Sequence, residues 1–249
     1  MNKTNIEYLT HTWNPLAMRC TPVSPGCQNC WHIVMADRLA QNPKINPEHR
    51  AAYAGITGPV LKPDELNAPF KLKKPAVIGV QFMGDLFHPV VKLDFVASII
   101  RVVQKCPQHT FIILTKKTEQ LDMFNYACGW PDLKNLWLGV TVENQEQANK
   151  RIPVLLQIPA AIRFVSVEPI LESIDLKIPR ASYAQLDGVI CGTESLGFKP
   201  GRDPGIDAIR NLKNQCVDTN TPFFLKQMTV NNKLVKMPEL DGKVWAEMP

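Results

Sequence analysis

Residues Leu136–Asn144 read LWLGVTVEN, an apolar run that ends in a carboxylate and an amide. The run is rich in β-branched residues and too short for a buried helix, so it predicts a strand. It is followed by Gln145–Gln157, whose composition favours a helix, although Pro153 must kink that helix or begin a new turn. A strand, a polar turn and a helix in this order make one repeat of an α/β fold.

Similar apolar runs recur on both sides of this segment, with starts 25 to 35 residues apart. Val91–Gln104 and Asp207–Val217 carry apolar residues at steps of three and four, as one face of a helix does. Alternating strands and helices predict a parallel sheet, and six or more units predict a full or partial barrel. The other expected strands are Thr12–Asn14, Val77–Phe82, Phe111–Leu114, Ile162–Val167, Gly188–Cys191 and Phe223–Leu225, and a further helix is expected at His32–Gln41.

No shift in composition marks a domain boundary, so residues 1–249 are expected to form a single domain. The segment Pro43–Pro75 carries six prolines and few periodic residues, which predicts a long irregular excursion. Residues 228–249 are expected to form a loose C-terminal tail, with a strand pair through Leu234–Val235.

The composition limits the class of protein. With 45% apolar and 20% charged residues, the 249-residue chain is expected to be globular, and disordered, collagen-like and coiled-coil proteins are excluded. No apolar run approaches the roughly 20 residues of a membrane helix, and no signal region follows Met1, so we expect a cytoplasmic protein without a membrane partner. The net charge of +5 allows a weak preference for polyanions.

Polar residues follow each of the six predicted strands from Val77–Phe82 to Phe223–Leu225. Because the carboxyl ends of parallel strands meet on one rim of a barrel, these side chains are expected to surround a common site. The alternative is that polar residues simply end strands. The glycines of Gly84-Asp85 and Gly192-x-Glu194 favour a site, since glycine lets a ligand approach the backbone. The ionisable residues of the rim are Asp85, Lys116, Glu143, Glu168, Glu194 and Lys226, of which we take Lys116, Glu168, Glu194 and Lys226 as candidate catalytic residues.

Three of the seven cysteines, Cys20, Cys27 and Cys30, lie within eleven positions in a C-x6-C-x2-C pattern that contains two prolines and a glycine. Thiolates favour zinc or iron–sulfur clusters. A structural zinc ion needs a fourth ligand, for which His11, His32 and His88 are candidates. On a 4Fe–4S cluster, three thiolates leave one iron open, as metal-assisted chemistry requires. The four remaining cysteines are expected to be packing residues: Cys106, Cys128, Cys191 and Cys216.

Seven stretches in order along nearly the whole chain carry a resemblance to a known family. In them the sequence resembles the radical S-adenosylmethionine (SAM) enzymes, and most closely a phage-associated three-cysteine family of unknown function that is regarded as radical-SAM-like. The stretches are Thr12–Pro15 (TWNP), Cys20–Trp31 (CTPVSPGCQNCW), Met83–His88 (MGDLFH), Ile113–Lys116 (ILTK), Gly139–Asn144 (GVTVEN), Arg163–Pro169 (RFVSVEP) and Pro222–Gln227 (PFFLKQ).

The resemblance implies an α/β fold of the partial (βα)6 TIM-barrel type with a C-terminal extension. It also implies a 4Fe–4S cluster on the three cysteines, with SAM bound to the open iron. An electron donor such as flavodoxin or ferredoxin would drive reductive cleavage of SAM to a 5′-deoxyadenosyl radical. By position, Gly84 and Asp85 would contact the amino group of SAM, Lys116 its carboxylate, Glu143 and Asn144 its ribose, and Gly192 its adenine.

The cysteine segment also departs from the usual pattern of the superfamily. That pattern is C-x3-C-x2-C with an aromatic residue just before the third cysteine. Here the first gap has six residues, Asn29 precedes the third cysteine, and the aromatic residue, Trp31, follows it.

The substrate is expected to be a thymidine-derived pyrimidine base in phage DNA, which the enzyme would rearrange or modify as an isomerase, mutase or lyase. A modified nucleotide is a related substrate. Two other classes stay open, namely a radical enzyme acting on a small molecule and a metal-stabilised nucleic-acid-binding module without catalysis. Candidate phosphate contacts are Lys71, Lys73, Lys74, Lys199 and Arg202, and candidate stacking residues are Trp13, Trp31 and Phe87.

Overall fold

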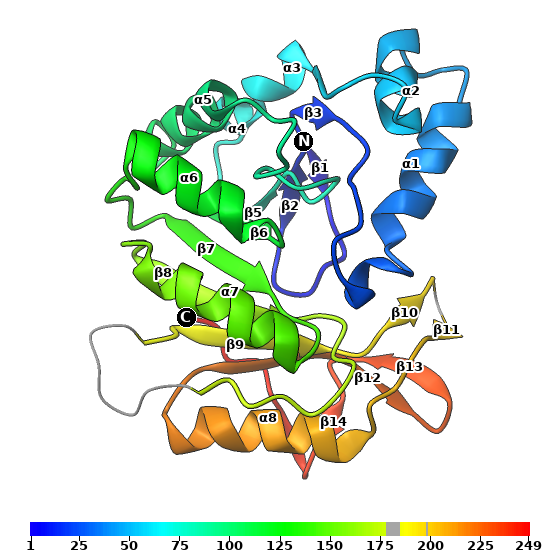
Figure 1. The fold of residues 1–249 in the computed structure, drawn as a ribbon, viewed down its shortest axis with the longest axis vertical. Coiled ribbons are helices and arrows are strands. Elements are labelled where there is room, and N and C mark those ends of the chain that lie inside the picture. The colour runs from blue at the N-terminus through cyan, green and yellow to red at the C-terminus, as the bar shows by residue number, and fades with distance from the viewer. Residues whose placement is uncertain (178–184, 198) are drawn as a thin grey trace. The chain divides into compact units, whose positions relative to one another are not determined.

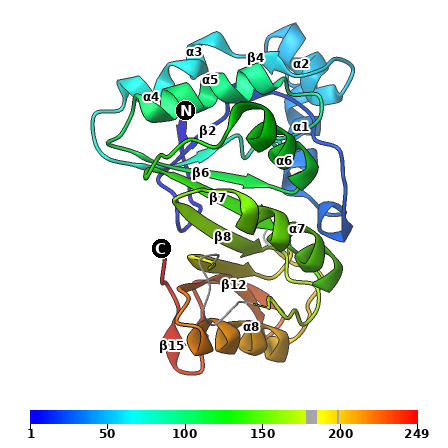
Figure 2. The ribbon, with the colours of Figure 1, turned by 60° about the vertical axis from the view of Figure 1, so that its left-hand side comes forward.

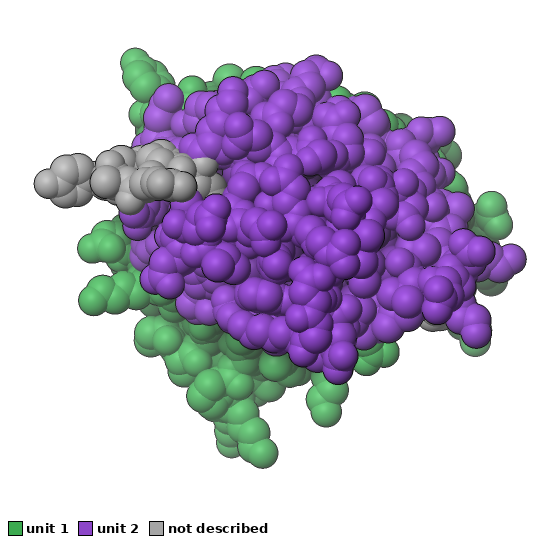
Figure 3. Space-filling model, turned by 90° about the horizontal axis from the view of Figure 1, so that it is seen from below, with its two compact units in different colours: residues 1–23, 30–137 green, residues 24–29, 138–249 purple. Residues whose placement is uncertain are grey.

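A computed structural model describes residues 1–177, 185–197 and 199–249 of the chain (Figure 1). These residues pack into two compact units, whose atoms are distinguished in Figure 3. The chain passes from one unit to the other and back within the cysteine segment. The expectation of a single domain stays a prediction. Unit 1 is formed by Met1–Val23 and Cys30–Trp137, and unit 2 by Ser24–Asn29 and Leu138–Pro249.

The sheet of unit 1 has the strand order β1-β2-β5-β6. Strands β2, β5 and β6 are parallel, and β1 is antiparallel to β2. The predicted strands at Thr12–Asn14, Val77–Phe82 and Phe111–Leu114 are confirmed within a few residues. The bounds are β1 Asn2–Lys3, β2 His11–Trp13, β5 Val77–Val80 and β6 Thr110–Thr115, with a separate antiparallel pair formed by β3 Leu16–Ala17 and β4 Val60–Leu61.

Helices of unit 1 also occupy the proline-rich segment that the sequence predicts to be irregular. Pro47, Pro63 and Pro69 stand in the first turns of three of them, where the missing N–H of proline costs nothing. The helix expected at Val91–Gln104 is confirmed and buries Val96 and Ile99. The bounds are α1 Trp31–Gln41, α2 Pro47–Ala54, α3 Pro63–Leu66, α4 Ala68–Lys71, α5 Leu93–Gln104 and α6 Thr118–Cys128.

The sheet of unit 2 has the order β7-β8-β9-β12-β13, in which β8, β9 and β12 are parallel and β13 is antiparallel to β12. Helix α7 contacts β8 and α8 contacts β12 (Figure 2). The register shifts between Leu225 and Gln227, so Lys226 lies at a bulge. The bounds are β7 Leu136–Thr141, α7 Gln145–Gln157, β8 Ile162–Val167, β9 Gly188–Gly192, β10 Ser195–Leu196, β11 Lys199–Pro200, α8 Ile206–Asp218, β12 Phe223–Val230 and β13 Lys233–Lys236.

The C-terminal residues are ordered against β12 rather than loose. The strand pair through Leu234–Val235 is confirmed as the β12–β13 hairpin, and a second hairpin is formed by β14 Glu239–Leu240 and β15 Lys243–Val244. Beyond it, the amide of Leu225 donates to the carbonyl of Trp245 at 2.9 Å. The Trp245 ring lies 6.1 Å from that of Phe223.

The largely parallel strands with intervening helices confirm the α/β class. Closure of the strands into a barrel is not seen in the described part of the chain, so the TIM-barrel form stays a prediction. Among residues 1–177, 185–197 and 199–249, no helix has the length and apolar character needed to cross a membrane.

A substitution of Gly139 in β7 tests how closely the side chains of unit 2 are packed. A Cβ at this position would lie 2.3 Å from the ring of Phe164, whose position in β8 leaves little room to shift. We expect Gly139→Ala to lower the free energy of unfolding by about 1–3 kcal/mol in urea titrations, because a close-packed core does not accept an added methyl group. Gly58→Ala is the control, since a Cβ there meets nothing within 4 Å. Equal stability of the two variants would contradict this packing.

Candidate functional site

Asp85 follows β5 and is buried in unit 1. One carboxylate oxygen accepts hydrogen bonds from the Phe87 amide at 3.0 Å and the Thr115 hydroxyl at 2.7 Å, and the other accepts from the Lys116 amide at 3.0 Å. Burial raises the pKa of Asp85 despite these bonds. The carboxylate therefore joins the turns after β5 and β6.

Gly84 and Lys116 accompany Asp85 in the predicted site, and they differ in whether a side chain is available to bind a ligand. Gly84 has φ +134°, and a Cβ there would lie 2.7 Å from Met18, so the turn requires glycine. Lys116 is half-buried, and its ammonium forms no ion pair or hydrogen bond with any residue that the structure describes. Of the predicted site residues in unit 1, Lys116 therefore has the charge that is free to meet a ligand.

Three contacts hold the start of the cysteine segment in unit 1. Lys117 Nζ donates to the Thr21 carbonyl at 3.0 Å, and His88 Nε2 lies 3.0 Å from the Thr21 hydroxyl. The Cys20 amide donates to His32 Nε2 at 3.3 Å. Burial, together with the charge of Arg19, lowers the pKa of His32 to about 4. The ring is therefore neutral, and its Nε2 accepts from the backbone.

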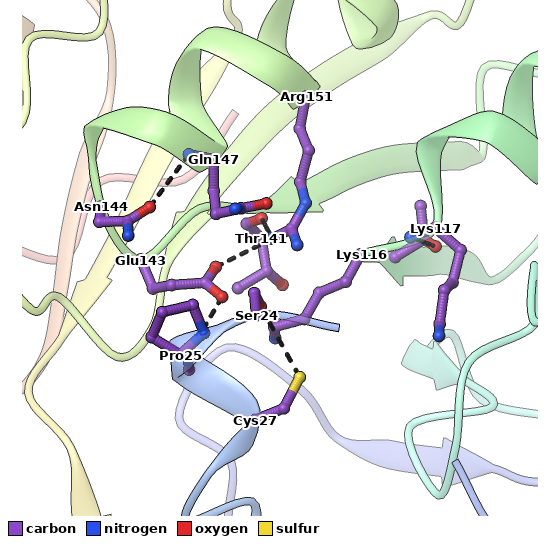
Figure 4. A network of polar contacts seen from close by, with 12 residues as sticks. Ser24, Pro25, Cys27, Lys116, Lys117, Thr141, Glu143, Asn144, Gln147 and Arg151 are labelled. Atoms are coloured by element: carbon purple, nitrogen blue, oxygen red, sulfur yellow. Dashed lines mark hydrogen bonds and ion pairs between the residues drawn. The ribbon is translucent and has the colours of Figure 1, made fainter. Parts of the chain in front are cut away.

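In unit 2, Glu143 forms a buried ion pair with Arg151 of α7 (Figure 4). Arg151 Nη1 lies 2.9 Å from Glu143 Oε2 and donates to the Thr141 carbonyl at 2.7 Å. The Gly26 amide donates to Glu143 Oε1 at 3.2 Å, and a Cβ on Gly26 would lie 3.0 Å from the carboxylate. The Glu143 side chain is 0% exposed. Its carboxylate therefore fixes the short helix η1, Pro25–Cys27, beside the end of β7.

Asn144 and Cys27 each have a local partner near this pair (Figure 4). Asn144 caps α7, and its side-chain oxygen accepts from the Gln147 amide at 3.0 Å. The Ser24 hydroxyl lies 3.7 Å from Cys27 Sγ.

Glu194 has a second arginine as its partner. Arg202 donates to Glu194 Oε2 through Nε at 2.9 Å and through its amide at 3.0 Å, and its Nη2 contacts Oε1. Asn29 Nδ2 donates to the same Oε2 at 3.1 Å. The Glu194 side chain is 4% exposed. The hydrogen bonds from Arg202 lower the pKa of Glu194 to about 2, so the carboxylate is ionised.

Glu168 and Lys226 meet at the ends of β8 and β12. Lys226 Nζ lies 2.8 Å from Glu168 Oε1, and the Ser166 hydroxyl donates to Oε2 at 3.1 Å. A Cβ on Gly192 would lie 3.0 Å from Glu168 Oε1, so glycine at the end of β9 leaves the room that this carboxylate occupies. The side chains of Glu168 and Lys226 are 14% and 21% exposed. Both therefore keep some access to solvent.

The predicted site residues thus fall into two groups, one in each unit. Gly84, Asp85 and Lys116 lie together in unit 1, and Glu168, Gly192 and Lys226 lie together in unit 2. Glu143, Asn144 and Glu194 are also in unit 2, where their side chains have structural partners.

All seven cysteines carry thiols, and those of Cys20, Cys27 and Cys30 are partly exposed. Three accessible thiols in one short segment are the donors that a cluster with one open iron requires. Within the described residues, no three or more His, Cys, Asp or Glu side chains are grouped closely enough to hold a metal ion. The donor chemistry fits the cluster, and its assembly stays a prediction.

Other expectations about single residues have mixed outcomes. Cys106, Cys191 and Cys216 are buried as predicted, whereas Cys128 is exposed at the end of α6. Trp13 and Phe87 are core residues, so they do not offer rings for base stacking, while Trp31 is 52% exposed.

Sequence reasoning missed the roles of Arg151 and Gly26, and it assigned Arg202 to phosphate. Each arginine stands eight residues after its carboxylate. The one signal for Arg151 is a charged residue on the face of α7 that also buries Ala148, Ile152 and Leu155. Arg202 returns to Glu194 through a hairpin, and a hairpin of this kind gives no periodic pattern in the sequence from which the pair could be predicted.

Comparison with known proteins gives a family but no activity. A family model described as "Protein of unknown function (DUF5131)" matches residues 3–249. No curated protein and no solved structure is significantly similar to the chain.

The Glu143–Arg151 pair yields a stability prediction. Arg151→Ala leaves a buried carboxylate without its counter-charge, and we expect a loss of about 3–5 kcal/mol in the free energy of unfolding by urea. The double variant Glu143→Gln/Arg151→Met removes both charges and keeps an acceptor for Gly26, so it should recover part of this loss. A double variant as unstable as Arg151→Ala would contradict the pairing.

The lowered pKa of Glu194 predicts that the free energy of unfolding depends on pH. Since its folded pKa is about 2 and its ordinary value is 4.5, the ionised carboxylate stabilises the fold at pH values above 4.5. This contribution is lost as the pH falls from 4.5 toward 2. The difference in free energy of unfolding between the wild type and Glu194→Gln should be constant from about pH 7 to 5 and shrink below that. A difference that persists unchanged down to about pH 3 would show that the carboxylate is not held this way.

Proposed function

The chain belongs to the family of proteins of unknown function DUF5131, and we propose that it is a radical SAM enzyme. The observation that carries this proposal is the cysteine segment, where three partly exposed thiols stand within eleven residues. The zinc alternative is weaker because His32 and His88, two of the candidate fourth ligands, contact the Cys20 amide and the Thr21 hydroxyl.

Cys20, Cys27 and Cys30 would hold a 4Fe–4S cluster that has one open iron for SAM. When bound, this cluster would supply the electron for reductive cleavage of SAM into methionine and a 5′-deoxyadenosyl radical, which would take a hydrogen atom from the substrate. The electron would come from a donor such as flavodoxin or ferredoxin. Such chemistry needs reduced thiols, so we expect it in the cytoplasm, that of the host cell if the protein is phage-encoded.

The ammonium of half-buried Lys116, which forms no ion pair or hydrogen bond among the described residues, supports a contact with the carboxylate of SAM. Asp85 would act through the turns that it joins, placing Gly84 and Lys116 rather than offering a free carboxylate. Asn144 keeps its amide nitrogen for the ribose, since its oxygen caps α7. Glu143 is fully buried, and we assign it to the support of the cysteine segment. The adenine contact of Gly192 stays part of the proposal.

Glu168 and Lys226 are the best candidates for substrate contacts. They are partly exposed, oppositely charged and 2.8 Å apart, so a ligand with complementary groups could enter between them or bind to either one. Two opposite charges at this distance suit binding and orientation of a polar substrate. Glu194, in contrast, is already occupied by Arg202.

For the substrate, we propose a thymidine-derived base in phage DNA or a modified nucleotide, on which the enzyme acts as an isomerase, mutase or lyase. The support is the net charge of +5 and the exposure of Lys71, Lys73 and Lys74 and of the Trp31 ring. Mass spectrometry of nucleosides from cognate DNA, treated with the enzyme under reducing conditions, tests this. An unchanged profile, with turnover of a free small molecule, would remove DNA from the proposal.

Metal analysis tests the cluster itself. Anaerobically prepared protein should contain about four iron and four sulfide per chain and should release 5′-deoxyadenosine from SAM under dithionite. Cys27→Ala should lose both the iron and the product, because a thiolate ligand is gone. Cys128→Ala is the matched control, since this thiol is exposed but lies outside the cysteine segment. Zinc without sulfide in the wild type, or full cleavage by Cys27→Ala, would refute the proposal.

A further inference from the structure

We infer that Glu194 and Arg202 are positioning residues for Cys27, which hold the segment Ser24–Asn29 in one conformation before any metal is bound. The purpose of this arrangement, which is to place Cys27 for a metal, rests on the proposed function. The contacts themselves all lie within unit 2. It assigns Glu194 a role other than direct catalysis.

Arg202 and Glu194 contact the segment on both sides of Cys27. Arg202 Nη2 donates to the Pro25 carbonyl at 2.9 Å, and its Nη1 donates to Gln28 Oε1 at 3.2 Å. Asn29 Nδ2 donates to Glu194 Oε2 at 3.1 Å. The pair therefore reaches both ends of the short helix that carries Cys27.

The chain around the pair fixes its geometry. Glu194 follows β9, and the β10–β11 hairpin returns the chain so that the Gly201 amide donates to the Glu194 carbonyl at 2.9 Å. A Cβ on Gly201 would lie 2.6 Å from Glu194 Oε2, so only glycine allows this return. Arg202 then engages both oxygens of the carboxylate, the arrangement that gives an arginine–carboxylate pair its directional strength.

Glu143 supplies the second attachment, through the Gly26 amide. Between them the two carboxylates and Arg202 engage Pro25, Gly26, Gln28 and Asn29, the residues that flank Cys27. A ligand loop ordered in advance avoids the entropy cost of ordering when metal binds, and it gives the metal one geometry.

Hydrogen–deuterium exchange and thiol alkylation of the full-length protein without metal test the inference. In Arg202→Ala we expect the amides of Gly26–Asn29 to exchange at least ~10-fold faster, and Cys27 to react with iodoacetamide faster by a similar factor, because the segment opens more often. Arg202→Lys should recover part of the protection, since lysine keeps the charge but not the two-pronged contact. Arg210→Ala is the matched control, because Arg210 pairs with Asp207 and Asp241 and with no residue of the segment.

Peptides from β8 and β9 report whether Arg202→Ala is folded and should exchange as in the wild type. Unchanged exchange and alkylation at residues 26–29 in Arg202→Ala would overturn the inference, and so would an equal effect in Arg210→Ala. If those peptides lose protection, the same comparison is made between the wild type and Arg202→Lys, where unchanged exchange at residues 26–29 overturns the inference.

Spectroscopy of the loaded protein separates this inference from the proposed function. The electron paramagnetic resonance spectrum of the reduced cluster should be shifted or broadened in Arg202→Ala and not in Arg210→Ala. If no iron binds to the wild type, the proposed function fails while the exchange experiment still decides whether the segment is held. If iron binds and the exchange is unchanged, the positioning role fails while the proposed function stands.

Discussion

The buried carboxylate of Glu143 is the constraint on which the candidate site depends. A charge removed from water is costly unless opposite charge and hydrogen bonds surround it. Arg151 supplies the charge, and the Gly26 amide supplies a further hydrogen bond. Six residues from the N-terminal part of the chain, Ser24–Asn29, are thereby built into unit 2.

The polar residues at the strand ends have two roles, since those paired with arginine support the site and others can face a ligand. Glu143 and Glu194 are almost fully buried, and their oxygens are taken up by arginine and by the cysteine segment. Glu168 with Lys226 keeps partial exposure, and Lys116 keeps an unpaired ammonium within the described structure. Supporting groups and ligand-facing groups are therefore different residues, although all of them follow strands and look alike in the sequence.

The sequence could predict the main strands and several helices, but it could not predict which polar side chains pair with one another. Short apolar runs located β5 to β9 and β12 because burial of a strand needs little besides apolar side chains. Helix α7 has its predicted bounds with Pro153 inside it, whereas α6 was missed because only Thr118, Leu121 and Phe124 are buried there. The partners of Glu143 and Glu194 depend on side-chain geometry across a turn and a hairpin, which no spacing pattern encodes. The same holds for Trp13, whose ring is buried although its neighbours in the sequence are polar.

The central claim is that Cys20, Cys27 and Cys30 hold a cluster with one open iron. Mössbauer spectroscopy of protein reconstituted anaerobically with ⁵⁷Fe, with and without SAM, tests it most directly. We expect a 4Fe–4S spectrum in which one iron site changes when SAM is added, while the other three keep thiolate ligation. A protein that binds no cluster, or a cluster whose spectrum is the same with and without SAM, would contradict it.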